Sequence, residues 1–266
     1  MSRYAAPVKP FKVRIRFWLV AIFLLIVYVW SFTGIPFEGI KGTAGQIARA
    51  IGHGFLHPDF NYVYIPEGED LLRGLLDTLA ISVLGTFISA VLCVPFAFWA
   101  AVNMSARGPV SASGKVMLSI VRTIPEIVMA IMFIKAVGPG PFAGVLALGL
   151  HSIGMLGKLF SEAIENLDLG PAEALTASGA NRLQVLWYGV LPQVLPEFFS
   201  FTLYRFEINV RSAAILGMIG AGGIGTPLIF ALEARSWPRV AIILYGIILM
   251  VTLIDVISGY IRKRLV

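Results

Sequence analysis

The stretch EALTASGANRLQVLWYGVLPQ, residues 173–193, is polar although long apolar runs surround it on both sides. Glu173 would lie in the first turn of a helix, where the helix dipole favours an acidic side chain. Gly179 can adopt the left-handed conformation that ends a helix. Asn181 and Gln184 have the spacing of a capping box that starts the next helix. The stretch therefore predicts two short helices joined at a glycine, with their surface in water.

The composition of the whole chain indicates an integral membrane protein. Of its 266 residues, 58% are hydrophobic and only 14% are charged, whereas a soluble domain carries about 25% charged residues. The net charge is +6, and basic residues gather beside apolar runs at 9–16 and 262–264. That placement favours membrane orientation over nucleic-acid binding. The single cysteine, Cys93, excludes an internal disulfide and a cysteine-based metal site.

Six runs approach the roughly 20 apolar residues that a spanning helix needs. The first is longer than the apolar core of a secretory signal and lacks a small-residue cleavage site, so we expect it to be retained. The sequence therefore predicts an all-α polytopic membrane protein with about six transmembrane helices. The predicted spans are Phe17–Phe37, Leu75–Ala101, Val116–Val137, the run between Lys135 and Lys158, Val194–Met218 and Pro238–Ile261.

The basic flanks predict the orientation of these spans. If the N-terminus is cytoplasmic, six crossings return the C-terminus to the cytoplasm, which satisfies the positive-inside rule at both ends. Residues 38–73 then face outward, and residues 161–192, here called the inner loop, face the cytoplasm. We expect two regions: residues 1–74, with the first helix and the outer loop, and residues 75–266, with the remaining spans and the inner loop.

The outer loop contains the stretch TAGQIARAIGHGFLH, residues 43–57, whose apolar residues form a helical stripe. We expect this helix to lie along the outer membrane interface. His53 and His57 are four residues apart, a spacing that can hold a metal, and Asp59 is close. Without a firm third ligand, two solvated histidines are the favoured interpretation, and no metal site is predicted.

The inner loop is too long for a simple connection. Packed helices are joined by about 2–8 residues, whereas this loop has about thirty, with caps and an amphipathic face formed by Leu183, Leu186, Trp187 and Val190. A plain connector remains an alternative, but the pattern favours a surface on which another protein docks.

The inner loop resembles the EAA loop of the permease subunits of bacterial ABC importers. That pattern reads Glu-Ala-Ala, three residues, Gly, nine residues, an aliphatic residue, one residue and Leu-Pro. Leu175 replaces the second alanine, and Gly189 replaces the aliphatic residue and puts the straightness of the second helix in doubt. The resemblance implies a type I ABC importer permease fold in which the loop couples to a cytoplasmic ATPase. The implied coupling residues are Glu173, Ala174, Gly179, Ala180, Asn181, Leu191 and Pro192.

Three further stretches resemble the phosphonate importer permease: RTIPEIVMAIMF at 122–133, GPGPFAGVLALGLHSIGMLGKLFSEAIENL at 138–167 and RSAAILGMIGAGGIG at 211–225. The resemblance implies import of a small oxyanion, phosphonate or else phosphate or phosphite, across the bacterial plasma membrane. Permeases for other solutes such as methionine share the glycine-rich ending. The implied partners are a second permease subunit, identical or paralogous, two ATPase subunits and an extracytoplasmic substrate-binding protein.

Ionisable residues inside the predicted spans are costly and should face a partner or a wet cavity. Glu207 and Arg211 have the spacing of a helical ion pair, as do Arg122 and Glu126. Arg205 has no such partner along its own helix, so it is the sharper candidate for contact with a passing oxyanion. Such pairs can also serve only to neutralise charge or to lock helices together. The candidate residues of the translocation path are Arg122, Glu126, His151, Arg205, Glu207, Arg211, Gly220, Gly222 and Gly223.

The glycine-rich run GMIGAGGIG, residues 217–225, follows a predicted membrane helix. A phosphate-binding loop would follow a strand instead, and the chain contains no GxxxxGK[ST] motif. We expect a close-packed turn at the outer end of the fifth span. For His151 in the fourth span, a packing role is favoured over a proton relay. No catalytic constellation is visible, so the chain is predicted not to be an enzyme and to hold no cofactor.

Two other functional classes remain as alternatives at this stage. A stand-alone carrier driven by an ion gradient would use the charged residues in the spans for coupling, but such carriers commonly show two related halves. No internal repeat is visible in this sequence. A membrane scaffold without a solute path would explain the inner loop but not the charges in the spans.

Overall fold

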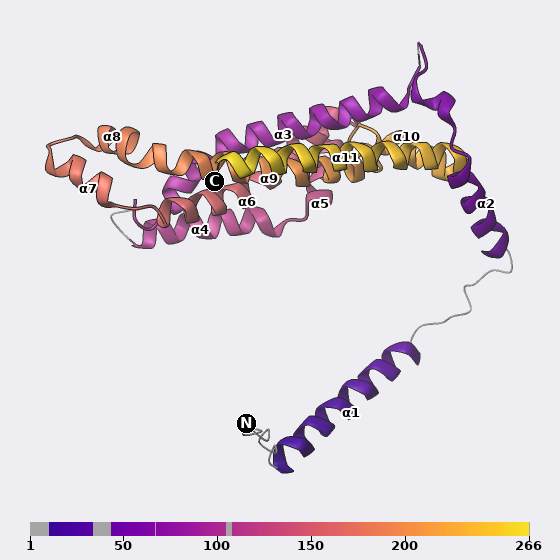
Figure 1. Ribbon diagram of the computed structural model, residues 1–266, viewed down its shortest axis with the longest axis horizontal. Helices are drawn as coiled ribbons and strands as arrows, with labels where there is room; N and C mark the ends of the chain where they lie inside the picture. Colours follow the sequence, from indigo (N-terminus) through magenta and orange to yellow (C-terminus); the bar gives the residue numbers. More distant parts are fainter. Residues whose placement is uncertain (1–10, 34–43, 67, 105–107, 266) are drawn as a thin grey trace, which may run out of the picture. The chain divides into compact units, whose positions relative to one another are not determined.

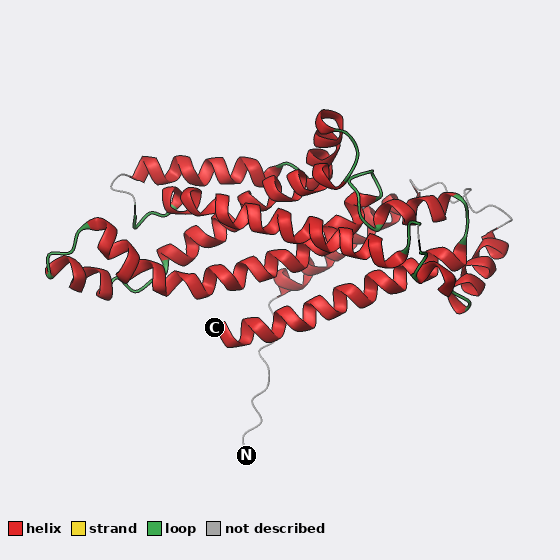
Figure 2. Cartoon of the chain, turned by 90° about the horizontal axis from the view of Figure 1, so that it is seen from above, coloured by secondary structure: helices red, strands yellow, loops and turns green. Residues whose placement is uncertain are grey.

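The computed structural model describes residues 11–33, 44–66, 68–104 and 108–265. Every regular element in this part of the chain is a helix (Figure 2). The chain divides into two units, residues 1–50 and 51–266. The first unit contains α1 (Phe11–Thr33), whose large apolar side chains from Ile15 to Phe32 are exposed, as expected of a helix surrounded by lipid. Helix α2 (Ala44–Leu56) includes residues of both units. Its presence confirms the helix predicted within residues 43–57 of the outer loop.

The second unit is a bundle of long helices with short helices at both ends (Figure 1). Helices α3 and α6 pack along each other, and α9 packs against both. Helices α4 and α5 contact α6, and α11 contacts α9 and α3. The elements of this unit are η2 (Phe60–Val63), α3 (Leu71–Ala100), α4 (Gly108–Thr123), α5 (Glu126–Val137), α6 (Pro141–Glu165), α7 (Gly170–Ala177), α8 (Arg182–Val185), the π turn η3 (Leu186–Val190), α9 (Leu191–Gly217), α10 (Gly225–Glu233) and α11 (Trp237–Leu265).

Small residues allow α6 to lie at the centre of the bundle. Its buried positions include Ala143, Gly144, Ala147, Gly149 and Gly154. Helices inside a membrane gain stability mainly from close packing of this kind, because lipid tails are as apolar as the side chains. The central position of α6 places Ser152 and His151, in its middle, beside helices that arrive from different parts of the chain.

Within the described part of the chain, four helices are long and apolar enough to cross a membrane: Ile15–Thr33 within α1, α3, α6 and α11. The pair α4 and α5 would make a fifth, although the two are bent by 78°. Helix α9 has 27 residues, about 40 Å at 1.5 Å per residue, but it carries two acids and two arginines. Helices therefore exist at all six predicted spans, while six crossings as such remain a prediction.

The third predicted span is not one helix. Helix α4 ends at Thr123 and α5 begins at Glu126, with Pro125 between them. Proline has no N–H to donate, and it drives the residue before it, Ile124, away from helical geometry. The prediction of a continuous helix over Val116–Val137 was therefore wrong.

Helices α7 and α8 extend beyond one end of the bundle, and α10 lies at the other end (Figure 1). The C-terminus lies toward the end that carries α7 and α8. The inner loop and the C-terminus thus share one side, as the predicted orientation requires.

Candidate functional site

The two predicted short helices of the inner loop are confirmed, together with their caps. Gly179 follows α7 with a φ of 84°, a conformation that glycine adopts without strain. The N–H of Gly179 donates to Thr176 O, and the N–H of Ala180 donates to Leu175 O, which is the pattern of a Schellman motif. Asn181 then caps α8 in a complete capping box with Gln184.

The second short helix does not end before the fifth predicted span. The chain stays helical from Arg182 to Gly217, with the π turn Leu186–Val190 between α8 and α9. Pro192 has no N–H, and its ring excludes the carbonyl one turn earlier, so a wider turn just before it relieves the conflict. Gly189 lies inside this π turn, and the doubt about a straight helix was therefore justified.

Leu175 and Gly189, the two departures from the EAA pattern, lie against each other. A Cβ placed on Gly189 would lie 3.1 Å from Leu175 Cδ1 and 3.2 Å from Ala172 Cα. The larger side chain on α7 therefore fills the space that glycine leaves free in the π turn. This contact holds α7 closely against the π turn.

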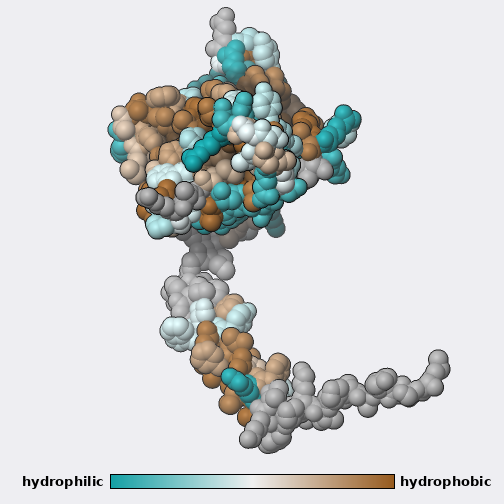
Figure 3. Space-filling model, turned by 90° about the vertical axis from the view of Figure 1, so that its left-hand side faces the viewer, coloured by the Kyte–Doolittle hydropathy of each residue, from teal (hydrophilic) through white to brown (hydrophobic). Residues whose placement is uncertain are grey.

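The two short helices of the inner loop are exposed to solvent. No residue of α7 or α8 is buried, and Leu183, Trp187 and Tyr188 expose 68%, 62% and 74% of their surface. With Asn181 and Gln184 they line a hollow of about 500 Å³. Figure 3 looks onto this end of the bundle, where hydrophilic residues stand beside hydrophobic ones. An exposed aromatic surface of this kind is typical of a protein–protein contact.

Glu173 and Ala174 lie on α7 with exposed side chains, and Leu191 and Pro192 form the first turn of α9. The structure thus brings the seven residues predicted for coupling into one compact segment. Their roles in coupling remain predictions.

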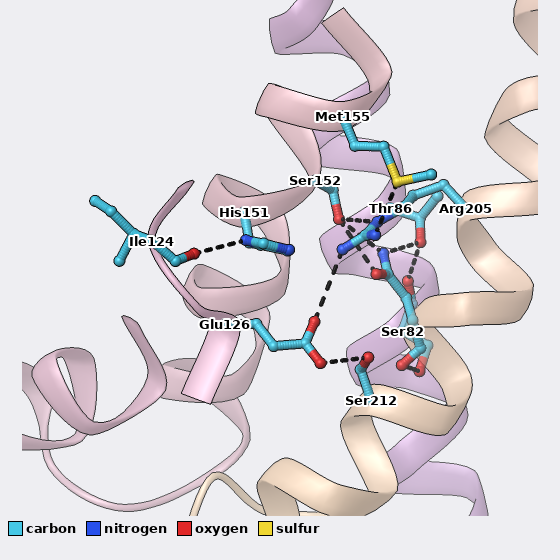
Figure 4. A network of polar contacts seen from close by, with 10 residues as sticks. Ser82, Thr86, Ile124, Glu126, His151, Ser152, Met155, Arg205 and Ser212 are labelled. Carbon is cyan, nitrogen blue, oxygen red and sulfur yellow. Dashed lines mark hydrogen bonds and ion pairs between the residues drawn. The ribbon is translucent and has the colours of Figure 1, made fainter. Parts of the chain in front are cut away.

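A buried polar cluster occupies the middle of the bundle (Figure 4). Arg205 of α9 is 3% exposed, and its Nε donates to Ser152 Oγ of α6 at 2.8 Å. Its Nη1 lies 3.2 Å from Met155 Sδ, and its Nη2 lies 3.8 Å from Glu126 Oε2 of α5. Arg205 therefore has an ion-pair partner from another helix, and the expectation that it is unpaired was wrong.

Asn209, one turn after Arg205, connects three helices. Its Nδ2 donates to Thr86 Oγ1 of α3 at 2.8 Å, and its amide also exchanges hydrogen bonds with Ser152. Ser82 Oγ of α3 lies 3.3 Å from Asn209 O. Asn209 and Ser152 are completely buried. Inside a membrane such groups must find protein partners, and here they fix the relative positions of α3, α6 and α9.

His151 lies beside the break between α4 and α5 (Figure 4). Its Nδ1 is 3.2 Å from the carbonyl oxygen of Ile124, which the break leaves without a helical partner. His151 thus has the hydrogen-bonded packing position that the sequence favoured over a proton relay.

The ion pairs predicted along single helices do not form. Glu207 instead accepts a hydrogen bond from Arg262 of α11 at 2.7 Å. Arg211 makes a two-pronged contact with Asp255 of α11, at 2.7 Å to each carboxylate oxygen. Interhelical partners prevail here because a fixed bundle brings them into better geometry than neighbours one turn apart.

Glu126 does not pair with Arg122. Its carboxylate turns to α9, whereas Arg122 lines a hollow of about 260 Å³ between α4 and α6, together with Lys115 and Lys158. The two residues lie on opposite sides of the break at Pro125, so their four-residue spacing no longer places them on one helix face.

The glycine-rich run forms the close-packed turn that was predicted after the fifth span. A Cβ on Gly222 would lie 2.6 Å from Pro141 N, so the turn could not lie against α6 with any larger residue there. Thr78 Oγ1 of α3 accepts a hydrogen bond from Ile224 N at 2.8 Å. The turn is therefore fastened to the helices on both of its sides, and Gly220, Gly222 and Gly223 line an outer hollow of about 700 Å³.

The histidines of the outer loop stack on each other. The rings of His53 and His57 lie 4.4 Å apart, and His57 Nδ1 is 3.2 Å from His53 O. Asp59 caps the short helix η2 through Asn61 N. Within the described ranges, no group of three histidine, cysteine or acidic residues is placed to hold a metal.

Residues 93–266 match the model of a protein family described as the binding-protein-dependent transport system inner membrane component. The chain belongs to this family. The match extends from the last part of α3 to the C-terminus, and so it includes the inner loop, Arg205 and the glycine-rich turn.

Named relatives and a solved structure agree with this membership. This chain is 48% identical to the phosphite transport system permease protein PtxC of Stutzerimonas stutzeri over 193 residues. The alignment covers 73% of this chain and 70% of PtxC. It is 47% identical over 122 residues to a protein of Escherichia coli K12 named as the putative cryptic phosphonate transport system permease protein PhnE2. That alignment covers 46% of this chain and all of PhnE2. Its fold matches a chain of the MetNI methionine ABC transporter in inward-facing conformations with a TM-score of 0.63 at 22% identity, over 74% of this chain and 96% of that chain. The permease therefore has the fold of an ABC importer permease.

Several residues of the polar cluster were missed by the sequence analysis of the permease. Thr78, Ser82, Thr86 and Ser89 are all buried and lie on one face of α3. Their spacing of three or four residues inside an otherwise apolar helix is the signal that would have predicted a polar face. Asn209 carries no charge, and the search for ionisable residues passed over it.

The outer hollow of the permease also contains acidic residues that the sequence analysis did not single out: Glu69, Asp70 and Asp77, beside Arg73. Asp70 caps α3, and the backbone N–H of Arg73 donates to its carboxylate at 2.7 Å. This hydrogen bond holds the pKa of Asp70 below its ordinary value. The carboxylate therefore stays charged in the cap down to a lower pH than an ordinary aspartate.

Proposed function

We propose that this chain is the membrane subunit of an ATP-driven importer of a small phosphorus oxyanion in the bacterial inner membrane. The observation that carries the proposal is the inner loop, a doubly capped helix pair with an exposed aromatic surface at the end of the bundle that also carries the C-terminus. Family membership supports transport that depends on a binding protein.

The proposed partners supply the functions that this chain lacks: nucleotide binding, the second half of the path and delivery of the solute. The chain contains no GxxxxGK[ST] motif, so a separate ATPase subunit would supply the nucleotide site. Two permease subunits, identical or paralogous, would form one path between them, and each would offer its inner loop to one of two ATPase subunits. An extracytoplasmic binding protein would deliver the solute.

In the proposed mechanism, ATP binding closes the two ATPase subunits and moves the inner loops as levers. The continuous helix from Arg182 to Gly217 joins the docking surface directly to Arg205 and the outer turn. A push at α7 and α8 would therefore reach the middle of the membrane along one helix. The path would alternate between outward and inward access by rocking of packed helices.

The solute class rests on the relatives and on the charges of the path. The relatives' names specify phosphite and phosphonate, and phosphonate, phosphate and phosphite share a tetrahedral oxyanion that arginine recognises through two parallel hydrogen bonds. We propose that Arg122, Glu126, His151, Arg205, Glu207, Arg211 and the glycines of the outer turn lie along the path. An uptake assay with competing oxyanions and the cognate binding protein discriminates between these solutes, and methionine serves as the unrelated competitor.

The first test addresses the proposed coupling. Glu173→Arg reverses a charge in the docking segment, and Gly179→Val puts a branched side chain where φ is 84°. We expect both variants to insert normally but to lose ATP-dependent uptake and to co-purify poorly with the ATPase. Glu233→Arg, a charge reversal at an exposed acid on α10 at the other end of the bundle, is the matched control and should retain the ATPase. Uptake at the wild-type rate in either loop variant would count against the proposal and favour a stand-alone carrier.

A further inference from the structure

The guanidinium of Arg205 has one nitrogen without a hydrogen bond, although its side chain is only 4% exposed. Nε and Nη1 have Ser152 Oγ and Met155 Sδ as partners, whereas Nη2 has none. Glu126 Oε2 is 3.8 Å from Nη2, beyond the 2.7–3.2 Å of a hydrogen bond. A buried charged donor without a hydrogen bond is costly, so the site is incomplete as it stands.

Comparison with the other ion pairs of α9 shows that the long distance is specific to this one. Arg262 approaches Glu207 to 2.7 Å, and Arg211 approaches both oxygens of Asp255 to 2.7 Å. These two pairs are direct, hydrogen-bonded contacts that join α9 to α11. Arg205 and Glu126 attract each other but do not form a direct hydrogen bond.

Neutral polar groups surround Arg205 and Glu126. Ser152 Oγ accepts from Arg205 Nε and donates to Asn209 Oδ1, so its hydrogen is already used. Ser212 Oγ donates to Glu126 Oε1 at 2.7 Å (Figure 4). Hydroxyl groups donate readily to an oxyanion. With Glu126 withdrawn, Ser212 Oγ and Arg205 Nη2 would both be left to donate to an anion.

Glu126 is the component of the cluster that can leave. It is the first residue of α5, directly after the 78° break at Pro125, and its side chain is 26% exposed. At the break, His151 Nδ1 lies 3.2 Å from Ile124 O. A rotation of the partly exposed Glu126 side chain would withdraw the carboxylate from Arg205 while α5 keeps its packing against α6.

We propose that Arg205 is an oxyanion-binding subsite of the path, and that Glu126 is its resident counter-anion, which the transported anion displaces. This inference rests on the proposed function. With Glu126 withdrawn, Nη2 and the hydroxyl of Ser212 bind the anion. When the Glu126 side chain returns, its carboxylate competes for the same nitrogen and repels the anion. Binding is thereby kept weak enough for transport, which a permanently open arginine would not allow.

The test measures anion binding to the assembled importer without its binding protein. The complex is placed in lipid nanodiscs with ADP present to fill the nucleotide sites, and binding of radiolabelled inorganic phosphate is measured by equilibrium dialysis. Glu126→Gln removes the competing charge and keeps the shape. We expect it to bind phosphate about tenfold more tightly than the wild type, the gain of one charge-assisted hydrogen bond. The Glu126→Gln/Arg205→Gln double variant should lose this gain.

Two further variants keep the result decisive. Glu233→Gln removes an exposed carboxylate on α10, away from Arg205, and is the matched control, for which we expect wild-type affinity. Glu126→Asp retains the charge but draws it away from Nη2, so it should give an intermediate gain, even if Glu126→Gln assembles poorly. The proposal is overturned if neither Glu126 variant binds phosphate more tightly than the wild type, or if the double variant keeps the gain.

The result of the phosphate-binding test can be distinguished from the result of the uptake test of the proposed function. ATP-dependent uptake by wild-type vesicles is measured independently with the binding protein present. Absence of uptake of every oxyanion rejects the importer function, whatever Glu126→Gln binds. Normal uptake together with unchanged phosphate affinity in the Glu126 variants rejects only the subsite.

Discussion

At the scale of single residues, three charged side chains of α9 form ion pairs with residues of other helices. Arg205 faces α5, and Glu207 and Arg211 face α11. A charge in the middle of a membrane costs at least about 2.5 kcal/mol on insertion scales, so each must be neutralised where it lies. The ion pairs therefore set which helices can lie next to α9, in addition to any role in transport.

A double-mutant cycle tests this for Arg211 and Asp255. Arg211→Ala or Asp255→Ala alone leaves one charge unpaired inside spanning helices, whereas the double variant removes both. We expect the double variant to be less destabilised than the sum of the single variants, by about 1 kcal/mol. Thermal unfolding of the purified protein measures the effect. The pair Lys158 and Glu162 is similarly exposed but lies one turn apart on α6 and joins no two helices, so it is the control and should be nearly additive. Additivity at Arg211 and Asp255 as well would contradict a structural role for their contact.

The cap of α3 predicts a specific dependence of stability on pH. Because the pKa of Asp70 is lowered in the folded protein, its charged form stabilises the fold above the ordinary carboxyl pKa near 3.8. That contribution is lost as the pH falls below this value and through the lowered pKa. Asp70→Asn keeps a capping side chain but cannot be charged. We expect the melting temperature of the variant to lie below that of the wild type at pH 6 and the gap to close toward pH 3. A constant gap would show that the charge of Asp70 contributes nothing.

At the scale of elements, local signals were sufficient for the inner loop and insufficient for the spans. The glycine after α7 and the capping box of α8 are satisfied within a few residues, so the sequence alone predicts them. Pro125 is an equally local signal, but the apolar residues on both sides of it favoured the prediction of one continuous span, so the break between α4 and α5 was missed. The partners of Arg205 and Arg211 lie 79 and 44 residues away, on helices whose packing no local pattern specifies.

The contact between α7 and the π turn gives a prediction at this scale. Gly189→Val adds atoms where Leu175 Cδ1 and Ala172 Cα leave no room, and it should push α7 outward. We expect ATP-dependent uptake to fall several-fold. Leu175→Ala frees part of that space, so the double variant should recover part of the uptake, with the backbone of Ala172 preventing full recovery. Uptake by reconstituted vesicles is the measurement, and Leu175→Ala alone is the control. A double variant no better than Gly189→Val would show that the two side chains do not compensate.

At the scale of the molecule, the second unit buries a set of polar side chains while many of its large apolar side chains are exposed. Ser82, Ser152 and Asn209 are buried, while Phe87 and Leu249 expose 65% and 62% of their surface. Water would not support this distribution, whereas a bilayer covers the apolar surface and forces the polar groups to pair inside. Composition alone predicted this environment. Composition alone does not give the number of crossings, because α9 carries four charged residues and the α4–α5 pair is bent.

The central claim is that α7 and α8 lie in the cytoplasm, where an ATPase can reach them, and their sidedness tests it most directly. Cys93 is the only cysteine of the chain and is fully buried, so a Cys93→Ser background allows single cysteines to be placed at will. Ser178→Cys reports on the inner loop and Asn61→Cys on the opposite end of the bundle. We expect a membrane-impermeant maleimide to label Asn61→Cys in right-side-out vesicles and Ser178→Cys only in inside-out vesicles. Labelling of Ser178→Cys from the outer side would contradict the account, because no ATPase could then contact the inner loop.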